Sequence, residues 1–391
     1  MAICVLGGGW LAARYGRRGA RTSMWAGALC GVLNLLILGA VLKSLSSENF
    51  VRYAAIWAPT SIIATAIVAL IGGLLAGRGA ATGAAVNWRC AFACVAAGAT
   101  LLLLSAGGAV TGAEAGLAVP DWPSSFGYNM FLYPLAKMTG GVYFEHAHRL
   151  LGSLVGLTTV LLALYVWWTD PRGWVRGFAW VCVGAVIVQG VLGGFRVSEL
   201  SLTLAMVHGA LGQVFFCALV TMAVLTSRAW QSSVTVLPTA TVERDRTIGV
   251  VAFAAMFLQL IFGVLLRHAG DSLTWALHLH LTFAVVAAGC AGLYLLRVWG
   301  RGTSASPARR AAGVAGCVLI LQLLLGFAAL AGVLIDTGQP HWAQILATTL
   351  HQTVGAVLLA SIAATNVLCW RLIRPSHSRA FAASPAAARF D

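Results

Sequence analysis

The stretches VIVQGVLGGF (residues 186–195) and LILQLLLGFA (319–328) share one pattern, in which a glutamine stands four residues before a glycine in an apolar segment. Each is followed by a second matching stretch, MVHGALGQVFF at 206–216 and TLHQTVGAVLL at 349–359. His148 stands 41 residues before Gln189, and His280 stands 42 residues before Gln322. Self-similarity at matched spacing marks an internal repeat. We therefore expect residues from about 90 to 371 to form two similar halves of four helices each.

The composition is that of a membrane protein. Hydrophobic residues make up 60% of the chain and charged residues 9%, whereas about 25% of the residues of ordinary soluble domains are charged. A helix of roughly 20 apolar residues crosses a bilayer. We expect an all-α, polytopic fold, an eight-helix bundle of two repeated halves with two or three extra N-terminal helices. The ten expected crossings are 24–43, 54–77, 90–110, 147–168, 175–195, 203–226, 248–266, 274–298, 311–335 and 344–370. A short apolar piece, 1–13, is either interfacial or the remnant of another helix.

The net charge of +14 reflects membrane topology and not nucleic-acid binding. When the loops are counted alternately, nineteen arginines fall on one side of the expected helices. Cytoplasmic loops of membrane proteins are enriched in basic residues, so we expect the C-terminus and these loops to be cytoplasmic. The other side receives six basic residues, Lys43, Arg52, Lys137, Arg149, Arg196 and Arg267.

Four histidines fall at one predicted depth, His148, His208, His280 and His351, each near the start of a helix that runs inward. A lone histidine in a membrane helix is often a helix-to-helix hydrogen bond, but four at matched depth are harder to explain in that way. Imidazole is a common axial ligand of haem iron, and the later histidine helices carry no carboxylates or thiolates for a zinc or di-iron site. The repeat pairs His148 with His208 and His280 with His351, which predicts two haem sites.

His278 competes with His280 for the third ligand position. Residues two apart on a helix point about 200° from each other, so only one of the two can face the site. The 41 and 42 residue spacings favour His280. His146 and His268 are expected to be polar groups near the outer surface, and His341 and His377 are expected to lie in loops or tails.

The halves differ in the residues that flank the first ligand. Aligning them places Glu145 opposite Leu277 and Arg149 opposite Leu281. Residues three apart share a helix face, so we expect Glu145 beside His148, where a carboxylate can move protons. The alternative is an ion pair of Glu145 with Arg149. Arg149, Arg196 and Arg267 are candidate partners for haem propionates, and Arg196 and Arg267 can equally be interfacial side chains.

The motifs GGAVTGAEAGLAVPDWP (107–123) and EHAHRLLGS (145–153), followed by the three later histidines, resemble those of the haem A synthase family. The resemblance covers about residues 88 to 372. It implies an eight-helix duplicated bundle that oxidises the C8 methyl group of haem O to a formyl group, by successive hydroxylations and loss of water. By position, Glu145 matches the essential acid of the family, His148 and His208 match the axial ligands of the substrate haem, and His280 and His351 match those of a haem b cofactor.

The same resemblance implies a bacterial cytoplasmic (inner) membrane protein of cytochrome oxidase assembly. Its expected partners are haem O, membrane lipid, haem O synthase and cytochrome oxidase subunits. The family carries haem O with its farnesyl tail, which needs a groove open to lipid. Asp121 and Trp122 of the PDWP turn are candidates for covering the haem pocket. Tryptophan is also common at membrane interfaces, which is an equally good explanation of Trp122.

The chain departs from the family in two places. Some members carry a cysteine pair near the PDWP motif, whereas LAVPDWPSSFG holds none, so a thiol-dependent step in that loop is not available. Residues 1–85 lie outside the family core, and a packing or partner-docking role is expected for them. The expected parts are these extra helices (1–85), an N-terminal half (86–226), a cytoplasmic linker (227–246), a C-terminal half (247–372) and a cytoplasmic tail (373–391).

A different function is also compatible with two histidine pairs. A dihaem b-type electron-transfer subunit that oxidises quinol would leave both haems chemically unchanged, and Glu145 would then serve a proton path.

Overall fold

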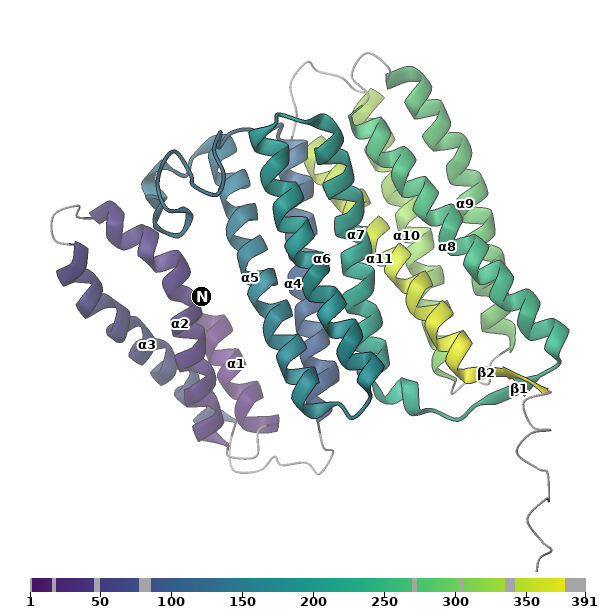
Figure 1. The fold of residues 1–391 in the computed structure, drawn as a ribbon, viewed down its shortest axis with the longest axis horizontal. Helices are drawn as coiled ribbons and strands as arrows, with labels where there is room; N and C mark the ends of the chain where they lie inside the picture. Colours follow the sequence, from purple (N-terminus) through teal and green to yellow (C-terminus); the bar gives the residue numbers. More distant parts are fainter. Residues whose placement is uncertain are drawn as a thin grey trace, which may run out of the picture. The chain divides into compact units, whose positions relative to one another are not determined.

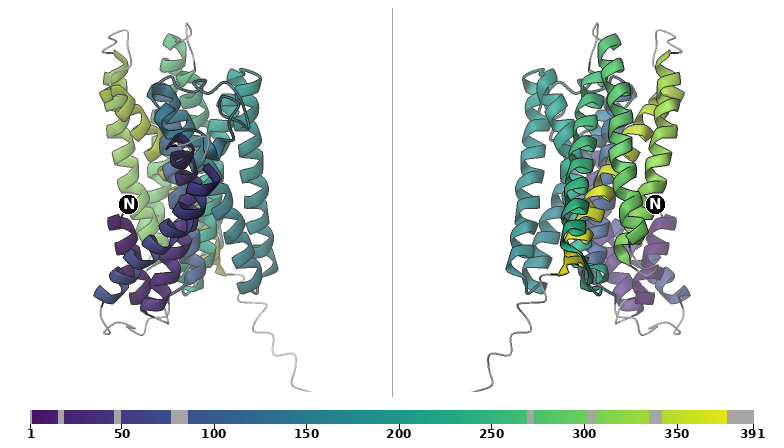
Figure 2. Two further views of the ribbon diagram at one scale, coloured as in Figure 1. Left: turned by 90° about the vertical axis from the view of Figure 1, so that its left-hand side faces the viewer. Right: turned by 90° about the vertical axis from the view of Figure 1, so that its right-hand side faces the viewer.

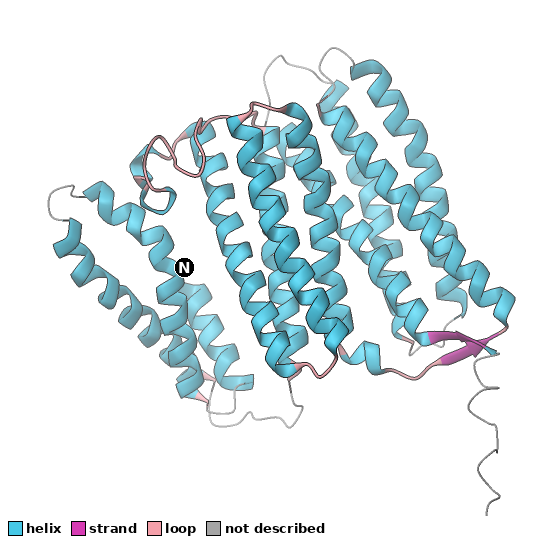
Figure 3. Cartoon of the chain, in the orientation of Figure 1, coloured by secondary structure: helices cyan, strands magenta, loops and turns pink. Residues whose placement is uncertain are grey.

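The computed structural model describes residues 2–15, 19–45, 50–76, 86–268, 273–301, 306–334 and 342–376. The described part is almost entirely helical (Figures 1 and 3). Its helices are α1 (Ala2–Tyr15), α2 (Ala20–Leu45), α3 (Phe50–Leu75), α4 (Trp88–Gly112), α5 (Gly140–Thr169), α6 (Gly173–Ser198), α7 (Leu202–Thr226), α8 (Thr239–Arg267), α9 (Leu273–Arg301), α10 (Pro307–Leu334) and α11 (Trp342–Leu372). Three short 3₁₀ turns, Met130–Leu132, Leu135–Lys137 and Arg228–Gln231, interrupt the loops.

Each of the ten expected crossings lies on one of the helices α2 to α11, and the short piece 1–13 corresponds to α1. Two helices begin well before the expected position, α5 at Gly140 and α8 at Thr239. Hydropathy marks only the part of a helix that lies in hydrocarbon, whereas the backbone hydrogen bonds continue into polar sequence such as TATVERDRT at 239–247.

The protein is a multi-pass membrane protein. Within the described ranges, nine helices are long and apolar enough to cross a bilayer, namely α3 from Ala55 onward and α4 to α11. Most side chains in the C-terminal half of α2 fall outside the described part. The crossing expected at 24–43 therefore stays a prediction.

The chain divides into two compact units. The first comprises Met1–Val86 and Ala118–His146, and the second comprises Asn87–Leu117 and Ala147–Asp391. In the first unit α1, α2 and α3 pack closely through small residues. Gly9 lies directly against the backbone of Ala69, and Gly72 against that of Leu6. Ser23 donates a hydrogen bond of 2.6 Å to the carbonyl oxygen of Gly9.

The loop 118–139 of the first unit is held by its own side chains. The Asp121 carboxylate accepts hydrogen bonds from the Ser124 hydroxyl and from the backbone N–H groups of Phe126 and Gly127. Burial alone would raise the pKa of Asp121, but these hydrogen bonds outweigh it and lower the pKa below its ordinary value. Asp121, which sequence reasoning offered as a cover for the pocket, is thus engaged inside the loop.

In the second unit α4 to α11 run side by side along a common direction (Figures 1 and 2). The helices α7 and α11 are its centre, because α7 packs against α4, α6, α8 and α11, and α11 also packs against α4, α8 and α10. Leu219 and Met222 of α7 and Leu358, Leu359 and Ile362 of α11 are fully buried. The remaining helices surround this pair.

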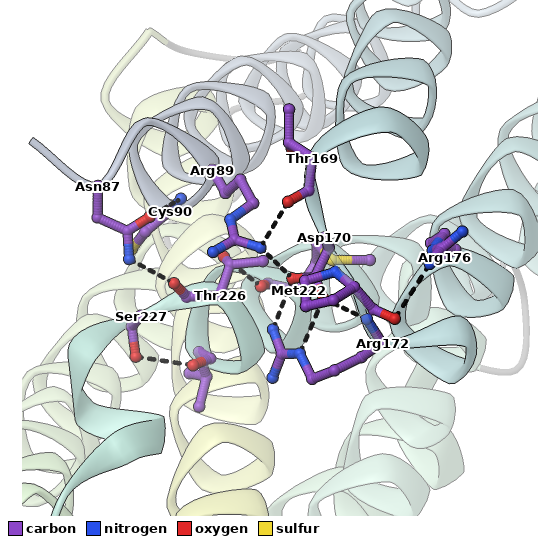
Figure 4. Close-up of polar contacts among 12 residues, drawn as sticks. Asn87, Arg89, Cys90, Thr169, Asp170, Arg172, Arg176, Met222, Thr226 and Ser227 are labelled. Atoms are coloured by element: carbon purple, nitrogen blue, oxygen red, sulfur yellow. Dashed lines mark hydrogen bonds and ion pairs between the residues drawn. The ribbon is translucent and has the colours of Figure 1, made fainter.

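Two buried carboxylates, which sequence reasoning did not single out, lie far from the predicted histidine sites. Asp170 follows α5 and pairs with Arg89 at 2.8 Å and with Arg172 at 2.7 Å (Figure 4). Asp245 of α8 pairs with Arg297 at 2.7 Å and with Arg301 at 2.6 Å. Burial alone would raise the pKa of Asp170, but hydrogen bonds from Arg172 and the charges of Arg172 and Arg89 outweigh it, so the pKa lies below its ordinary value. At the same end β1 (Thr235–Leu237) pairs in parallel with β2 (Ile373–Pro375).

Candidate functional site

The structure brings the four histidines together as two pairs in the second unit. The ring centres of His148 and His208 lie 6.4 Å apart with the rings at 84°, and those of His280 and His351 lie 6.3 Å apart at 78°. They are the ninth residue of α5, the seventh of α7, the eighth of α9 and the tenth of α11. All four therefore lie within the first three turns of their helices.

The spacing of each pair fits a bis-imidazole haem. Metal–imidazole nitrogen distances of about 2.0–2.1 Å place two ring centres roughly 6.3 Å apart across an iron atom. Among the described residues, no group of three or more His, Cys, Asp or Glu side chains converges to hold a metal ion. A haem supplies the remaining four ligands through its own nitrogens, so two imidazoles are sufficient for it but not for a tetrahedral zinc site.

Each histidine ring rests against a glycine of the helix that precedes its own in the chain. A Cβ atom added to Gly107 would lie 3.1 Å from Cε1 of His148, and the same distance applies to Gly193 and His208. Gly263 and His280, and Gly326 and His351, repeat it at 3.1 Å. The absence of a side chain at these four positions is what lets the rings approach the neighbouring helices. Gly193 and Gly326 belong to the repeated stretches and Gly107 opens the motif at 107–123, but the sequence did not predict that these glycines, or Gly263, contact a histidine.

Three glutamines contact three of the histidines. Gln259 Nε2 lies 3.1 Å from Nδ1 and 3.3 Å from Nε2 of His280, and donates to the His280 carbonyl oxygen at 3.1 Å. Gln322 Nε2 lies 3.4 Å from Nε2 of His351. With its amide turned so that nitrogen faces His208, Gln189 donates to the His208 carbonyl oxygen at 3.1 Å and lies 3.0 Å from its Nδ1.

The geometry separates His280 from His278. His280 faces His351, whereas the exposed His278 turns back along its own helix, where its Nδ1 lies 2.7 Å from the carbonyl oxygen of Thr274. This is the arrangement that the repeat spacing favoured.

Glu145 is buried, with 4% of its surface exposed. Its Oε2 atom accepts a hydrogen bond of 2.9 Å from the backbone N–H of Val119. Val119 belongs to the segment that carries the PDWP motif, so this loop holds the acid in place. Glu145 lies on α5, three residues before His148, and Arg149 follows that histidine as a half-buried residue.

His146, which was expected to be a polar group near the outer surface, is covered by the loop that precedes α5. The side chain is fully buried in the first unit, where its ring centre lies 5.0 Å from that of Tyr133 and its Nδ1 lies 3.2 Å from the Ser125 hydroxyl. The loop 118–139 folds over the start of α5, which hydropathy along the chain could not reveal. His268 lies just after α8, and burial and the charges of Arg267 and Arg196 lower its pKa. His341 and His377 lie outside the described residues.

Two of the three candidate propionate partners, Arg196 and Arg267, contact backbone carbonyl groups at or just after the C-terminal end of α4. Arg267 donates to the carbonyl oxygen of Thr111 at 2.7 Å, and Arg196 donates to that of Gly116. Cations at a helix C-terminus satisfy carbonyl groups that lack partners in the helix. A guanidinium has five N–H donors, so such a side chain can contact a carbonyl group and an acidic ligand at once.

Part of the chain matches a known protein family. Residues 90–277 match the COX15-CtaA family, described as cytochrome oxidase assembly protein. No curated protein matches the chain.

Proposed function

The chain belongs to the COX15-CtaA family of cytochrome oxidase assembly proteins, and from this premise we propose that it is a haem A synthase. It oxidises the C8 methyl group of haem O to a formyl group by successive hydroxylations and loss of water. The proposal rests on one observation above all, the presence of a buried acid one helical turn before His148 where the equivalent residue before His280 is Leu277.

The proposed architecture is a duplicated eight-helix bundle. The halves are 86–226 and 247–372, joined by the linker 227–246, with extra helices in 1–85 and the tail 373–391. Four contacts of one kind, each between a glycine of α4, α6, α8 or α10 and a histidine of the next helix, support this duplication.

The two histidine pairs have different roles in the proposal. His148 and His208 would hold the substrate haem, and His280 and His351 would hold haem b, which would supply electron transfer when bound. The near-equal ring separations of 6.4 and 6.3 Å support a similar macrocycle in both places.

Glu145 is the proposed catalytic acid. The Val119 N–H donates a hydrogen bond to one carboxylate oxygen, which fixes the side chain. The carboxylate can then accept the protons that leave the methyl carbon and its hydroxyl groups as they are oxidised. Arg149, Arg196 and Arg267 are the proposed partners of the propionates.

In the membrane, we place the histidine end at the periplasmic side and the C-terminus in the cytoplasm of a bacterial inner membrane. The excess of arginines at the opposite ends of the helices supports this orientation. The proposed partners are haem O, lipid around its farnesyl tail, haem O synthase and cytochrome oxidase subunits.

The test is pigment extraction from cells that express this protein together with a haem O synthase. Haem A on reverse-phase chromatography is the expected product. Glu145→Gln should abolish it while leaving haem b bound to the purified protein, whereas His280→Ala should remove that haem b. Haem O that persists unchanged beside a normal dihaem spectrum would instead indicate a quinol-oxidising electron-transfer subunit.

A further inference from the structure

We infer that Gln189, Gln259 and Gln322 are positioning residues for His208, His280 and His351, and that His148, which lacks such a glutamine, is the weakest of the four axial ligands. The inference rests on the proposed function in taking these histidines as haem ligands. It adds that the substrate site holds its haem unequally from the two sides.

The three glutamines occupy one repeated position. Each stands four residues before the glycine that supports a histidine ring, as in Gln189 and Gly193, Gln259 and Gly263, and Gln322 and Gly326. Residues four apart share a helix face. The glycine therefore makes room for the ring, and the glutamine one turn earlier reaches the same histidine.

The glutamine amides act on the histidine helix as well as on the ring. In its turned orientation, Gln189 donates to the carbonyl oxygen of His208 and accepts from the backbone N–H of Gly212 at 3.2 Å, so it bridges two successive turns of α7. Gln259 donates to the His280 carbonyl oxygen at 3.1 Å in the same way. An amide carries both donors and an acceptor, so it can satisfy either protonation state of Nδ1 while it holds the ring.

The fourth position of the series is Leu103, which stands four residues before Gly107. Its side chain fills the place of the amide. A Cβ atom added to Gly152, four residues after His148, would meet Leu103 Cδ1 at 4.0 Å. The matching atom on Gly355 would meet the Gln322 amide at 3.1 Å, and that on Gly212 would meet the Gln189 amide at 3.7 Å.

Leu103 offers no hydrogen-bonding group from its side chain. Its backbone carbonyl interacts with the His148 ring, as the backbone of Gln189 and Gln322 does with His208 and His351. Within the described ranges, Nδ1 makes no hydrogen bond of ordinary geometry either in His148 or in His351, so these two ligands differ in the Gln322 amide, whose Nε2 lies 3.4 Å from Nε2 of His351. The missing amide is therefore the difference between His148 and the other three ligands.

Hydrogen-bond partners behind a metal ligand fix its ring orientation and basicity, and removing one typically weakens metal binding by about 10- to 100-fold. His148, which has the Leu103 carbonyl but no side-chain amide, is expected to be the first of the four ligands to be displaced. This position lies on the helix that carries Glu145. The more weakly bound ligand, His148, would thus lie on the helix of the proposed acid, and the more strongly bound ligand, His208, would come from the other helix.

The test uses the full-length protein purified from cells that make haem b but no haem O, with carbon monoxide as the probe of ligand displacement. In a His280→Ala background, which isolates the N-terminal pair, the reduced haem should bind carbon monoxide. Leu103→Gln should reduce that binding about tenfold or more and sharpen the low-spin ferric EPR signal. Leu103→Met is the matched control, since it keeps the size and polarity of leucine, and it should behave as the parent does.

The reciprocal variants test the glutamines. Gln259→Met, with His278 and His280 intact, should give carbon monoxide access to the C-terminal haem and shift its reduction potential, and Gln259→Asn, which keeps an amide donor, should retain more of the parent spectrum. Equal carbon monoxide binding by the parent and by Leu103→Gln, with identical EPR spectra, would overturn the inference. These readouts do not involve haem O. If the protein forms haem A but substitution of Leu103 has no effect on carbon monoxide binding, the inference is refuted and the proposed function stands. If the ligands behave as expected but no haem A is formed, the proposed function is refuted and the inference stands.

Discussion

The backbone N–H of Val119 donates a hydrogen bond of 2.9 Å to Oε2 of Glu145. The donor lies in the PDWP loop and the acceptor on α5, so a residue 26 positions away in the chain fixes the proposed acid. Because the contact comes from the backbone, it does not depend on the identity of the side chain at 119.

The Val119 contact can be removed selectively. Proline has no backbone N–H, so Val119→Pro should release Glu145 and lower the rate of haem A formation. Hydrogen bonds to charged groups contribute about 1.5–3 kcal/mol, which corresponds to a loss of roughly 10- to 100-fold. Val119→Ala keeps the N–H and is the control. Equal activity of the proline and alanine variants, at equal content of bound haem b, would show that the contact is dispensable.

Replacing the glycine that contacts a histidine ring with alanine should weaken haem binding. In Gly193→Ala the new Cβ would lie 3.1 Å from Cε1 of His208, so the ring must shift, and overpacking of this kind costs about 1–3 kcal/mol. The expected result is a lower haem-to-protein ratio in the pyridine haemochrome assay. Gly190→Ala on the same helix is the control, because a Cβ there meets nothing within 4 Å. Similar haem loss from both variants would point to a general effect on α6.

The choice between two neighbouring histidines can be decided by spectroscopy. His280 faces His351 and His278 does not. His280→Ala should therefore lose the C-terminal haem, whereas His278→Ala should keep two haems per chain with an unchanged absorption spectrum. The reverse pattern would assign the ligand to His278 and would require α9 to rotate.

The buried Asp170 should make stability depend on pH. Its folded-state pKa is lowered, so its contribution is fully present above the unfolded-state pKa and is lost as the pH falls through the folded-state value. Thermal unfolding followed at the haem absorption band should show a midpoint that drops on acidification. Asp170→Asn should lower the midpoint at pH 7 and flatten this dependence. Glu199→Gln, at an exposed position, should leave both unchanged.

The helices and the repeat could be predicted from the sequence because they depend on local properties. Hydropathy and a 3.6-residue period are written along the chain, so α3 to α11 were predicted with their order and with the histidines at one depth. The pattern of a glutamine four residues before a glycine was visible as well, although its purpose was not. The helix starts at Gly140 and Thr239 were placed too late, since polar residues continue a helix without a hydropathy signal.

The sequence by itself indicated that the chain crosses a membrane many times, and it predicted four histidines at matched depth in two repeated halves. Only the tertiary structure decided that His280 and not His278 faces His351, that His146 is buried under the PDWP loop, and that Leu103 stands where the other helices carry glutamine beside a histidine. The reason is that rotation of a helix about its axis, and the identity of the side chain it meets, depend on which helices become neighbours. Those contacts join residues that are tens to hundreds of positions apart, so they cannot be predicted from the local periodicity of the sequence.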